Sequence, residues 1–294
     1  MSKEFCFLNV SNNDHAKLAH TMVQSARKAG IKEDFHIFHD LPQDIPGAKN
    51  YKVESKLDIS GCWFKLEYLL KFANTVELPE YVCWIDSDNY FVKTYSDPVS
   101  NFLEAAAGGV SMIILEDELT GLNNKRGDWW GISTPNTVRI FRELGCKAQR
   151  LYNTNGGLFM IRKDFIKAFY QLCQDFRQII NKKFNQNICE EYVLAIISNL
   201  FNVNPSLSNM SNGIGEKTWC CDWKNVFANA LPDGSKAWEA EHYLSGDKYM
   251  VNPSIVHVMK NKPFLVAEYT KFMEIQTPQT APVIEPVRKT RKNK

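Results

Sequence analysis

The stretch from Tyr81 to Val92 constrains this chain most, because an apolar strand runs directly into two carboxylates and leaves as a second apolar run. Side chains two positions apart point to the same face of an extended segment, so we expect Asp86 and Asp88 to converge on one cation. A hard divalent ion that carries a diphosphate would suit such a pair. An Asp-x-Asp also arises by chance in a chain of this length, and the alternative is a solvated turn after a buried strand.

The composition fits a soluble globular protein. The 294 residues are 44% apolar, enough for one large α/β domain or two modest ones. The net charge of +2 gives no argument for a general nucleic-acid or membrane-surface protein. The eight cysteines contain no Cys-x-x-Cys pair, and no apolar run is long enough for a signal peptide or a membrane span. We therefore expect reduced thiols and a cytoplasmic protein.

The first forty residues predict a parallel β-α-β unit. Residues 5–10 form an apolar strand, residues 15–29 a helix closed by Gly30, and residues 34–40 a second strand. This arrangement places the loop that begins at Asn9 and Val10 at the carboxyl edge of the sheet, where α/β proteins bind nucleotides. The chain has no Gly-x-Gly-x-x-Gly and no P-loop, which argues against a dinucleotide-binding dehydrogenase or a P-loop kinase.

Further helices and strands alternate along the chain. The patterns predict helices over 62–72, 97–107, 135–144, 164–183 and 189–199, strands over 111–115, 158–162 and 254–258, and a polar loop over 116–130. Asn155, Gly156 and Gly157 are expected to form a polar turn before a buried strand, where glycine lets another group approach the backbone.

Several side chains have both a functional and a purely structural interpretation. Lys65 is either a surface lysine or a cation that reaches the same phosphates as the metal. Asp128, Trp129 and Trp130 suit a sugar-binding surface, or else a lid over the core. Glu190 and Glu191 are favoured at a helix start by the helix dipole alone. His257, in a short strand, is ordinarily a core residue, but lysines follow it closely.

Four motifs occur along the chain in this order: Asp86-Ser87-Asp88, Asn155-Gly156-Gly157, Glu190-Glu191, and His257 followed by Lys262-Pro263. Their order and spacing resemble those of the nucleotide-sugar glycosyltransferases of the GT-A fold. The chain looks most like the glycogenin and bacterial galactosyltransferase group over roughly residues 5–265. The resemblance implies an α/β fold with a mixed, mostly parallel, Rossmann-like central sheet flanked by helices. It also implies one domain over 1–270, with a nucleotide-binding half over about 1–110 and a sugar and acceptor half over 111–270.

The resemblance also implies roles for individual residues. Asp86, Asp88 and His257 would bind Mn²⁺ or Mg²⁺. A nucleoside-diphosphate sugar, most simply a UDP-sugar, would contact Asn9, Val10, Lys65, Asp86, Ser87, Gly156 and Lys262. The residues implied in catalysis are Asp88, Asn155, Glu191 and Asp128. The chain departs from the family in having Glu190-Glu191 in place of Asp-Gln, and in lacking a glycine between His257 and Lys262-Pro263.

The expected reaction is metal-dependent transfer of a hexosyl or pentosyl group to an acceptor hydroxyl. A retaining course is favoured because it needs no protein base; an inverting course would need one of Asp128, Glu191 or Asp222. A nucleotidyltransferase of similar fold and a non-catalytic nucleotide-sugar-binding protein are the alternatives. The acceptor would be a glycan or, through the basic tail, DNA. That tail, residues 271–294, is expected to be disordered, and five of its last seven residues are Lys or Arg.

Overall fold

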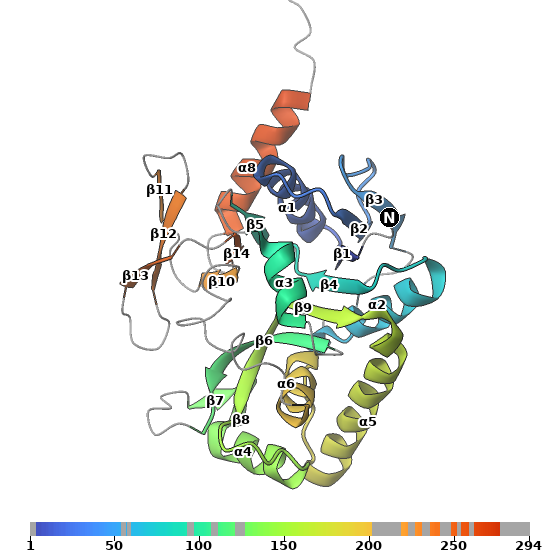
Figure 1. The fold of residues 1–294 in the computed structure, drawn as a ribbon, viewed down its shortest axis with the longest axis vertical. Helices are drawn as coiled ribbons and strands as arrows, with labels where there is room; N and C mark the ends of the chain where they lie inside the picture. The colour runs from blue at the N-terminus through green and yellow to red at the C-terminus, as the bar shows by residue number, and fades with distance from the viewer. Residues whose placement is uncertain are drawn as a thin grey trace, which may run out of the picture.

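A six-stranded sheet in the order β3-β2-β1-β4-β9-β6 forms the centre of the molecule (Figure 1). Its strands are β1 (Phe5–Val10), β2 (Asp34–His39), β3 (Lys49–Lys52), β4 (Tyr81–Ile85), β6 (Ser111–Glu118) and β9 (Tyr152–Arg162). The computed structural model describes residues 4–53, 57, 60–92, 97–106, 111–120, 127–201, 219–222, 227–230, 236–241, 248–251, 254–258 and 262–276.

The sheet is mixed but mostly parallel. β1 pairs in parallel with β2 and β4, and β2 with β3, whereas β9 runs antiparallel to both β4 and β6. Every residue of β1 is buried, because helices cover both faces of the central strands. The predicted fold class is confirmed.

Alternate residues of β1 serve two separate cores. Cys6, Leu8 and Val10 face a core shared with α2, α5 and α6, while Phe5 and Phe7 face α1 and α3. The helices are α1 (Asp14–Ala29), α2 (Phe64–Thr75), α3 (Pro98–Ala106), α4 (Thr134–Glu143), α5 (Ile166–Phe184), α6 (Glu190–Leu200) and α8 (Lys262–Gln276), with single turns at Ser60–Cys62 and Lys163–Phe165. The period-2 pattern of one strand thus fixes a three-layer arrangement.

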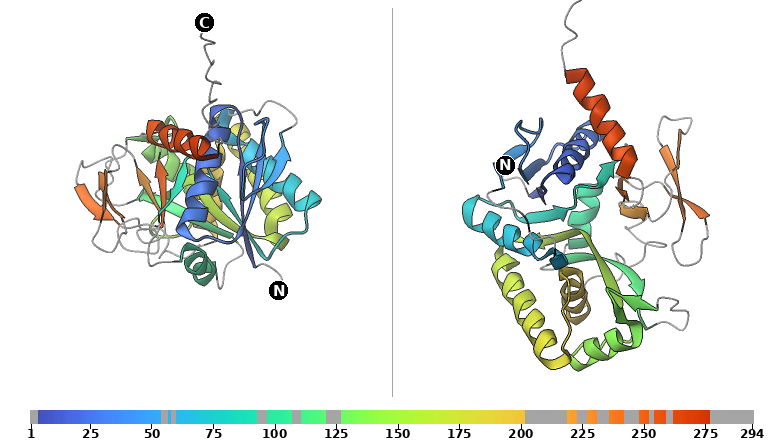
Figure 2. Two further views of the ribbon diagram at one scale, coloured as in Figure 1. Left: turned by 90° about the horizontal axis from the view of Figure 1, so that it is seen from above. Right: turned by 180° about the vertical axis from the view of Figure 1, so that it is seen from behind.

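Smaller sheets are attached to this framework. One contains β10 (Trp219–Asp222), β14 (Ile255–Val258) and β5 (Asn89–Phe91); a second contains β11 (Phe227–Ala230), β12 (Lys236–Glu241) and β13 (Lys248–Val251); and β7 (Asp128–Trp129) pairs with β8 (Ile132–Ser133). α8 lies beside α1 (Figure 2), where the Thr21 hydroxyl donates to the carbonyl of Leu265 at 3.1 Å. The first and last helices are thereby joined.

Most predicted elements are confirmed, including the closure of α1 by Gly30, whose φ of 94° lies in the left-handed region. The predicted polar turn at Asn155-Gly156-Gly157 is wrong: these residues lie inside β9 and are buried, because side chains of α2 and α6 and the turn after β4 satisfy their backbone groups. The predicted loop over 116–130 is shorter than expected, since β6 continues to Glu118 and β7 begins at Asp128.

The predicted C-terminal tail begins later than expected, because α8 continues to Gln276 and takes in residues 271–276. The rest of the tail, 277–294, lies outside the described residues. Within the described part of the chain, no helix has both the length and the apolarity needed to span a membrane.

Ser25 tests how α1 supports β5. The buried Ser25 hydroxyl oxygen accepts the N–H of Phe91 at 3.0 Å and donates to the carbonyl of Met22 at 2.7 Å. Ser25→Ala removes the acceptor of a buried N–H, so the free energy of unfolding should fall by about 1–3 kcal/mol in a urea titration. The control is Asn136→Ala, an exposed side chain of α4, which should change it by less than about 0.5 kcal/mol. Equal effects of both substitutions would contradict this role.

Candidate active site

A pocket of about 400 Å³ opens where β1 and β4 end, at the carboxyl edge of the central sheet. The first loop, the start of α2, the β4–β5 turn, β9, the start of α6, β14 and the first residue of α8 all contribute to its wall. The lining residues are Val10, Ser11, Asn12, His15, Leu57, Cys62, Phe64, Lys65, Asp86, Ser87, Asp88, Trp130, Asn155, Glu190, Glu191, His257 and Lys262. Segments from across the chain therefore meet at the predicted edge of the sheet.

The two aspartates converge for a different reason from the one predicted. Asp86, Ser87 and Asp88 form a turn between β4 and β5 and do not continue the strand; the N–H of Asn89 donates to the carbonyl of Asp86 at 3.2 Å. The Asn89 side-chain amide donates to the same carbonyl at 2.8 Å. The extended-strand expectation is wrong, but the turn still directs both carboxylates into the pocket.

Strand pairing brings His257 to Asp88. β5 pairs antiparallel with β14, with Asn89 opposite His257, and the N–H of Val258 donates to the carbonyl of Asp88 at 2.8 Å. As a result His257 Nε2 lies 3.0 Å from Asp88 Oδ1, although the residues are 169 positions apart. Lys262 Nζ lies 3.1 Å from the other oxygen, Asp88 Oδ2. One carboxylate is thus shared by an imidazole and an ammonium group.

This arrangement changes the pKa values of both partners. Burial by itself would raise the pKa of Asp88, but the charges and hydrogen bonds of His257 and Lys262 outweigh burial and lower it. Burial would lower the pKa of His257, and the charge and hydrogen bond of Asp88 raise it instead. Asp88 is consequently an anion under ordinary conditions, as a metal ligand must be.

Asp86, Asp88 and His257 have the geometry of a metal site. One potential ligand atom from each lies within 4.8 Å of the other two. Two carboxylates with one imidazole suit Mn²⁺ or Mg²⁺. The pocket is also rich in acids, because four carboxylates and two lysines line it. The residues present therefore fit the predicted ion.

Lys65 has partners within the protein for all three of its ammonium hydrogens. The buried Nζ lies 3.0 Å from Asp86 Oδ2, 3.0 Å from Glu190 Oε1 and 3.1 Å from the carbonyl of Gly156. The other oxygen of Asp86 accepts the indole N–H of Trp84 at 2.8 Å. Lys65 thus joins α2, α6, β9 and the turn after β4, whereas the sequence predicts that it contacts the donor.

Glu190 is the most strongly buried acid of the pocket, with 1% of its surface exposed. Burial raises its pKa to about 7; the charge of Lys65 opposes the rise and that of Glu191 adds to it. Among the described residues, Glu190 Oε2 has no hydrogen-bond partner. That oxygen is where a proton would reside below neutral pH.

Glu191 is held by two donors. Its Oε1 accepts the N–H of Gly156 at 2.7 Å, and its Oε2 accepts the indole N–H of Trp130 at 2.6 Å. Burial is the largest influence on the pKa of Glu191 and raises it. The side-chain hydroxyl of Thr154 donates to the backbone carbonyl of Glu191 at 2.9 Å, which fixes the start of α6 against β9.

The two glycines of β9 provide room for these acids and for the histidine. A Cβ at Gly156 would lie 2.8 Å from both Glu190 Oε1 and Glu191 Cγ. A Cβ at Gly157 would lie 2.5 Å from His257 Cε1. The sequence suggests close approach to this backbone, and the structure shows that protein side chains make it.

The pocket contains most of the predicted site residues. Val10, Lys65, Asp86, Ser87, Asp88, Asn155, Glu191, His257 and Lys262 line it, and Gly156 binds two of these side chains through its backbone. Asn9 does not line it; its buried Nδ2 donates to the carbonyl of Ile85 at 2.7 Å. Asp128 is exposed on β7 and is not a lining residue.

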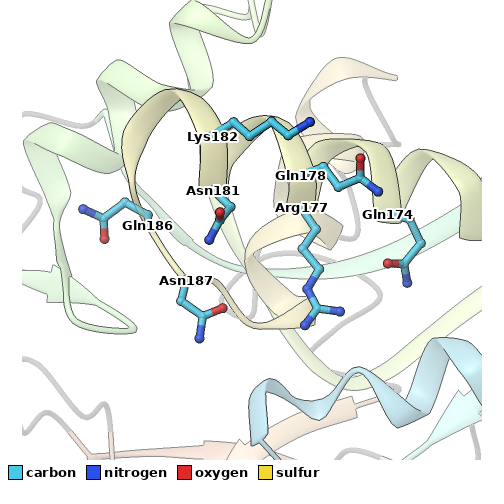
Figure 3. Close-up of a pocket in the computed structure, with 7 residues that line it drawn as sticks. All are labelled: Gln174, Arg177, Gln178, Asn181, Lys182, Gln186 and Asn187. Atoms are coloured by element: carbon cyan, nitrogen blue, oxygen red, sulfur yellow. The ribbon is translucent and has the colours of Figure 1, made fainter.

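Sequence reasoning assigned no site role to His15. Its Nδ1 lies 3.4 Å from the hydroxyl of Ser87, at the mouth of the first loop. Its position in the first turn of α1, directly after the loop at the sheet edge, is the sequence feature that could have indicated a place in the site. A second hollow, of about 340 Å³, is formed by α5 and the segment after it (Figure 3), but none of its seven lining residues is an acid, a histidine or a cysteine.

The comparisons with known proteins agree with this architecture. No protein-family model and no curated protein sequence matches the chain. The bifunctional glycosyltransferase WbbM matches with a TM-score of 0.56 at 9% identity, over 95% of this chain and 50% of its own, so this chain spans about half of WbbM. The fold is that of GT-A glycosyltransferases.

Two structures of the galactosyltransferase LgtC also match. One is a complex with donor and acceptor sugar analogues, with a TM-score of 0.47 at 10% identity. The other is an active-site mutant, with a TM-score of 0.49 at 11% identity. Each match covers 90% of this chain and 95% of LgtC.

Gly157→Ala should weaken metal binding. The new methyl group would overlap the His257 ring and push it away from Asp88, so the affinity for Mn²⁺ in a calorimetric titration should fall at least about tenfold. Gly127→Ala is the matched control, because a Cβ there meets nothing within 4 Å. Unchanged Mn²⁺ affinity in Gly157→Ala would contradict a ligand role for His257.

Glu190→Gln should change how stability depends on pH. A pKa raised by folding stabilises the protein below the unfolded value, and that contribution is lost as pH rises through the folded value. From pH 4.5 to about 7, the unfolding free energy of the native protein should therefore fall relative to Glu190→Gln, by on the order of 3 kcal/mol.

This effect is measured by urea unfolding across that pH range, with EDTA present throughout so that metal binding does not contribute. Glu67→Gln, on the exposed side of α2, controls for the loss of one negative charge. Parallel pH profiles of the unfolding free energy for the native protein and Glu190→Gln would show that folding does not raise the pKa of Glu190.

Proposed function

We propose that this protein is a metal-dependent glycosyltransferase that moves a sugar from a nucleoside-diphosphate sugar to an acceptor hydroxyl. The observation that carries the proposal is the convergence of Asp86, Asp88 and His257 in one pocket at the carboxyl edge of a GT-A sheet. These residues come from a turn and a distant strand, and no core packing requirement explains why two acids and an imidazole meet there. Fold alone would not identify the chemistry.

The donor diphosphate would lie between the metal ligands and Lys262. A divalent ion held by Asp86, Asp88 and His257 would neutralise the charge on the departing nucleoside diphosphate. Lys262 can add a second positive charge, since its side chain is 42% exposed and begins α8, where the partial positive charge of a helix collects. Lys65 would act by fixing Asp86 and Glu190, because its own hydrogens are already used.

The transferred sugar would occupy the wall made by β9 and the start of α6. Asn155 lines the pocket there, and its Oδ1 accepts the N–H of Gly157 at 2.8 Å, which fixes its amide group against β9. Glu191 lies beside it. The identity of the sugar and of the base, UDP-linked in the simplest case, stays a prediction.

A retaining course is favoured by the state of the pocket carboxylates. Asp86, Asp88 and Glu191 each use both oxygens, and Glu190 is bound to Lys65. Among the described carboxylates that line the pocket, only Glu190 Oε2 lacks a hydrogen bond, and that oxygen is buried and so poorly placed to reach an acceptor hydroxyl. A retaining transfer, in which the leaving phosphate can assist the incoming hydroxyl, needs no such base.

The acceptor is proposed to be a glycan. An acceptor role for DNA would depend on residues 277–294, which lie outside the described residues, and it stays a prediction together with the cytoplasmic location.

The decisive experiment is a screen of common nucleotide sugars for donor hydrolysis with Mn²⁺ or Mg²⁺. Release of a nucleoside diphosphate supports a glycosyltransferase. Release of pyrophosphate from a nucleoside triphosphate would identify a nucleotidyltransferase instead, and tight binding without turnover would identify a binding protein. Hydrolysis unaffected by EDTA would overturn metal dependence.

Asp88→Asn should abolish most turnover. The substitution keeps the shape of the side chain but removes the charge that pairs with His257 and Lys262, so donor turnover should fall at least about 100-fold. Asp164→Asn, an exposed acid outside the pocket, is the control and should retain full activity. Full transfer by Asp88→Asn in excess Mn²⁺ would show that the site is not catalytic.

A further inference from the structure

Trp130 lies at the tip of the β7–β8 hairpin and lines the pocket, yet 53% of its surface is exposed. Its neighbour Trp129 is buried and stacks on Tyr192 with ring centroids 5.0 Å apart. Of the two tryptophans singled out in the sequence, only Trp130 therefore presents a ring surface to a ligand.

The backbone at Trp130 is unfavourable for a tryptophan. Trp129 pairs with Ile132, so Trp130 and Gly131 form a two-residue loop, and both have positive φ, 53° and 75°. Two-residue hairpin loops with positive φ at both positions favour Asn-Gly, because a bulky side chain is strained in the left-handed region. The requirements of the turn explain Gly131 but not Trp130.

Among the described residues, one hydrogen bond holds the indole in place. Trp130 Nε1 donates to Glu191 Oε2 at 2.6 Å, while Glu191 Oε1 is bound to the N–H of Gly156. Glu191 is thus a rigid anchor, and the indole stands beside the wall proposed to hold the transferred sugar. The ring is positioned before any ligand arrives.

We propose that Trp130 is the stacking wall for the acceptor, and that the acceptor is a pyranoside that presents a face of C–H groups. An indole face attracts polarised C–H groups of a sugar. Because the ring is half exposed, a sugar stacked on it would keep its other side open to solvent and to further residues of a glycan. The inference rests on the proposed function, because an acceptor site has meaning only beside a sugar donor.

Binding can be tested without turnover. In protein labelled with 5-fluorotryptophan, the ¹⁹F resonance of Trp130 is assigned as the one that Trp130→Asn removes from the seven. Titration with methyl β-galactopyranoside, with Mn²⁺ and UDP present and absent, should shift this resonance. Glycerol, which has hydroxyls but no ring face, should not. No shift with the pyranoside, or an equal shift with glycerol, would overturn the inference.

Kinetics provide the second test. Trp130→Asn should raise the KM for the pyranoside acceptor at least about tenfold, and should change the KM for the donor by a clearly smaller factor. It should not lower the melting temperature, because asparagine suits the turn better. Phe201→Ala is the matched control, since Phe201 is 50% exposed but lies outside the pocket, and its acceptor KM should not change.

The two proposals fail in different ways. Absence of donor hydrolysis by the native protein would overturn the proposed glycosyltransferase function. Normal donor hydrolysis with an unchanged acceptor KM in Trp130→Asn would sink only the role of Trp130. A parallel loss of donor hydrolysis and acceptor use would show that Trp130 supports the whole pocket and does not bind the acceptor.

Discussion

The buried ammonium group of Lys65 is the interaction on which the site depends. It joins Asp86, Glu190 and the carbonyl of Gly156, and so ties together α2, the turn after β4, the start of α6 and β9. Removing these charges from water is costly, and the cost is offset only because each hydrogen of the ammonium group has an acceptor. Lys262 is the more accessible of the two pocket lysines. Lys65 is therefore a structural cation, whereas Lys262 is suited to contact a phosphate group.

The acids of the pocket differ in their electrostatic environment. His257 and Lys262 lower the pKa of Asp88 and keep it ionised, whereas burial raises the pKa of Glu190 to about 7. Groups of one chemical type are thereby separated by their neighbours into a candidate metal ligand and a proton-holding acid. This difference depends on space as well as on charge. Gly156 and Gly157 of β9 leave room for the neighbouring acids and histidine, which a Cβ at either position would displace.

Trp130 shows a different compromise. A residue poorly suited to its turn is kept in place by a hydrogen bond to the half-buried carboxylate of Glu191, so local backbone strain coexists with a rigid ring at the pocket mouth. Strain that the surrounding structure holds in place is typical of functional positions. Asp128, which has an ordinary place on β7, lacks any such sign.

The sequence by itself determined most of the helices and the buried central strands, and it singled out Asp86 and Asp88, because these features follow from local periodicity and from the residues that end each element. Only the tertiary structure decided the rest. The pairing of β5 with β14 brought His257 to Asp88, and the packing of α6 on β9 set Glu191 between Gly156 and Trp130. The structure also replaced a predicted strand by a turn at the aspartates, and a predicted turn by a strand at the glycines. Local pattern could not settle these points, because the partners that satisfy each polar group come from segments distant in the chain.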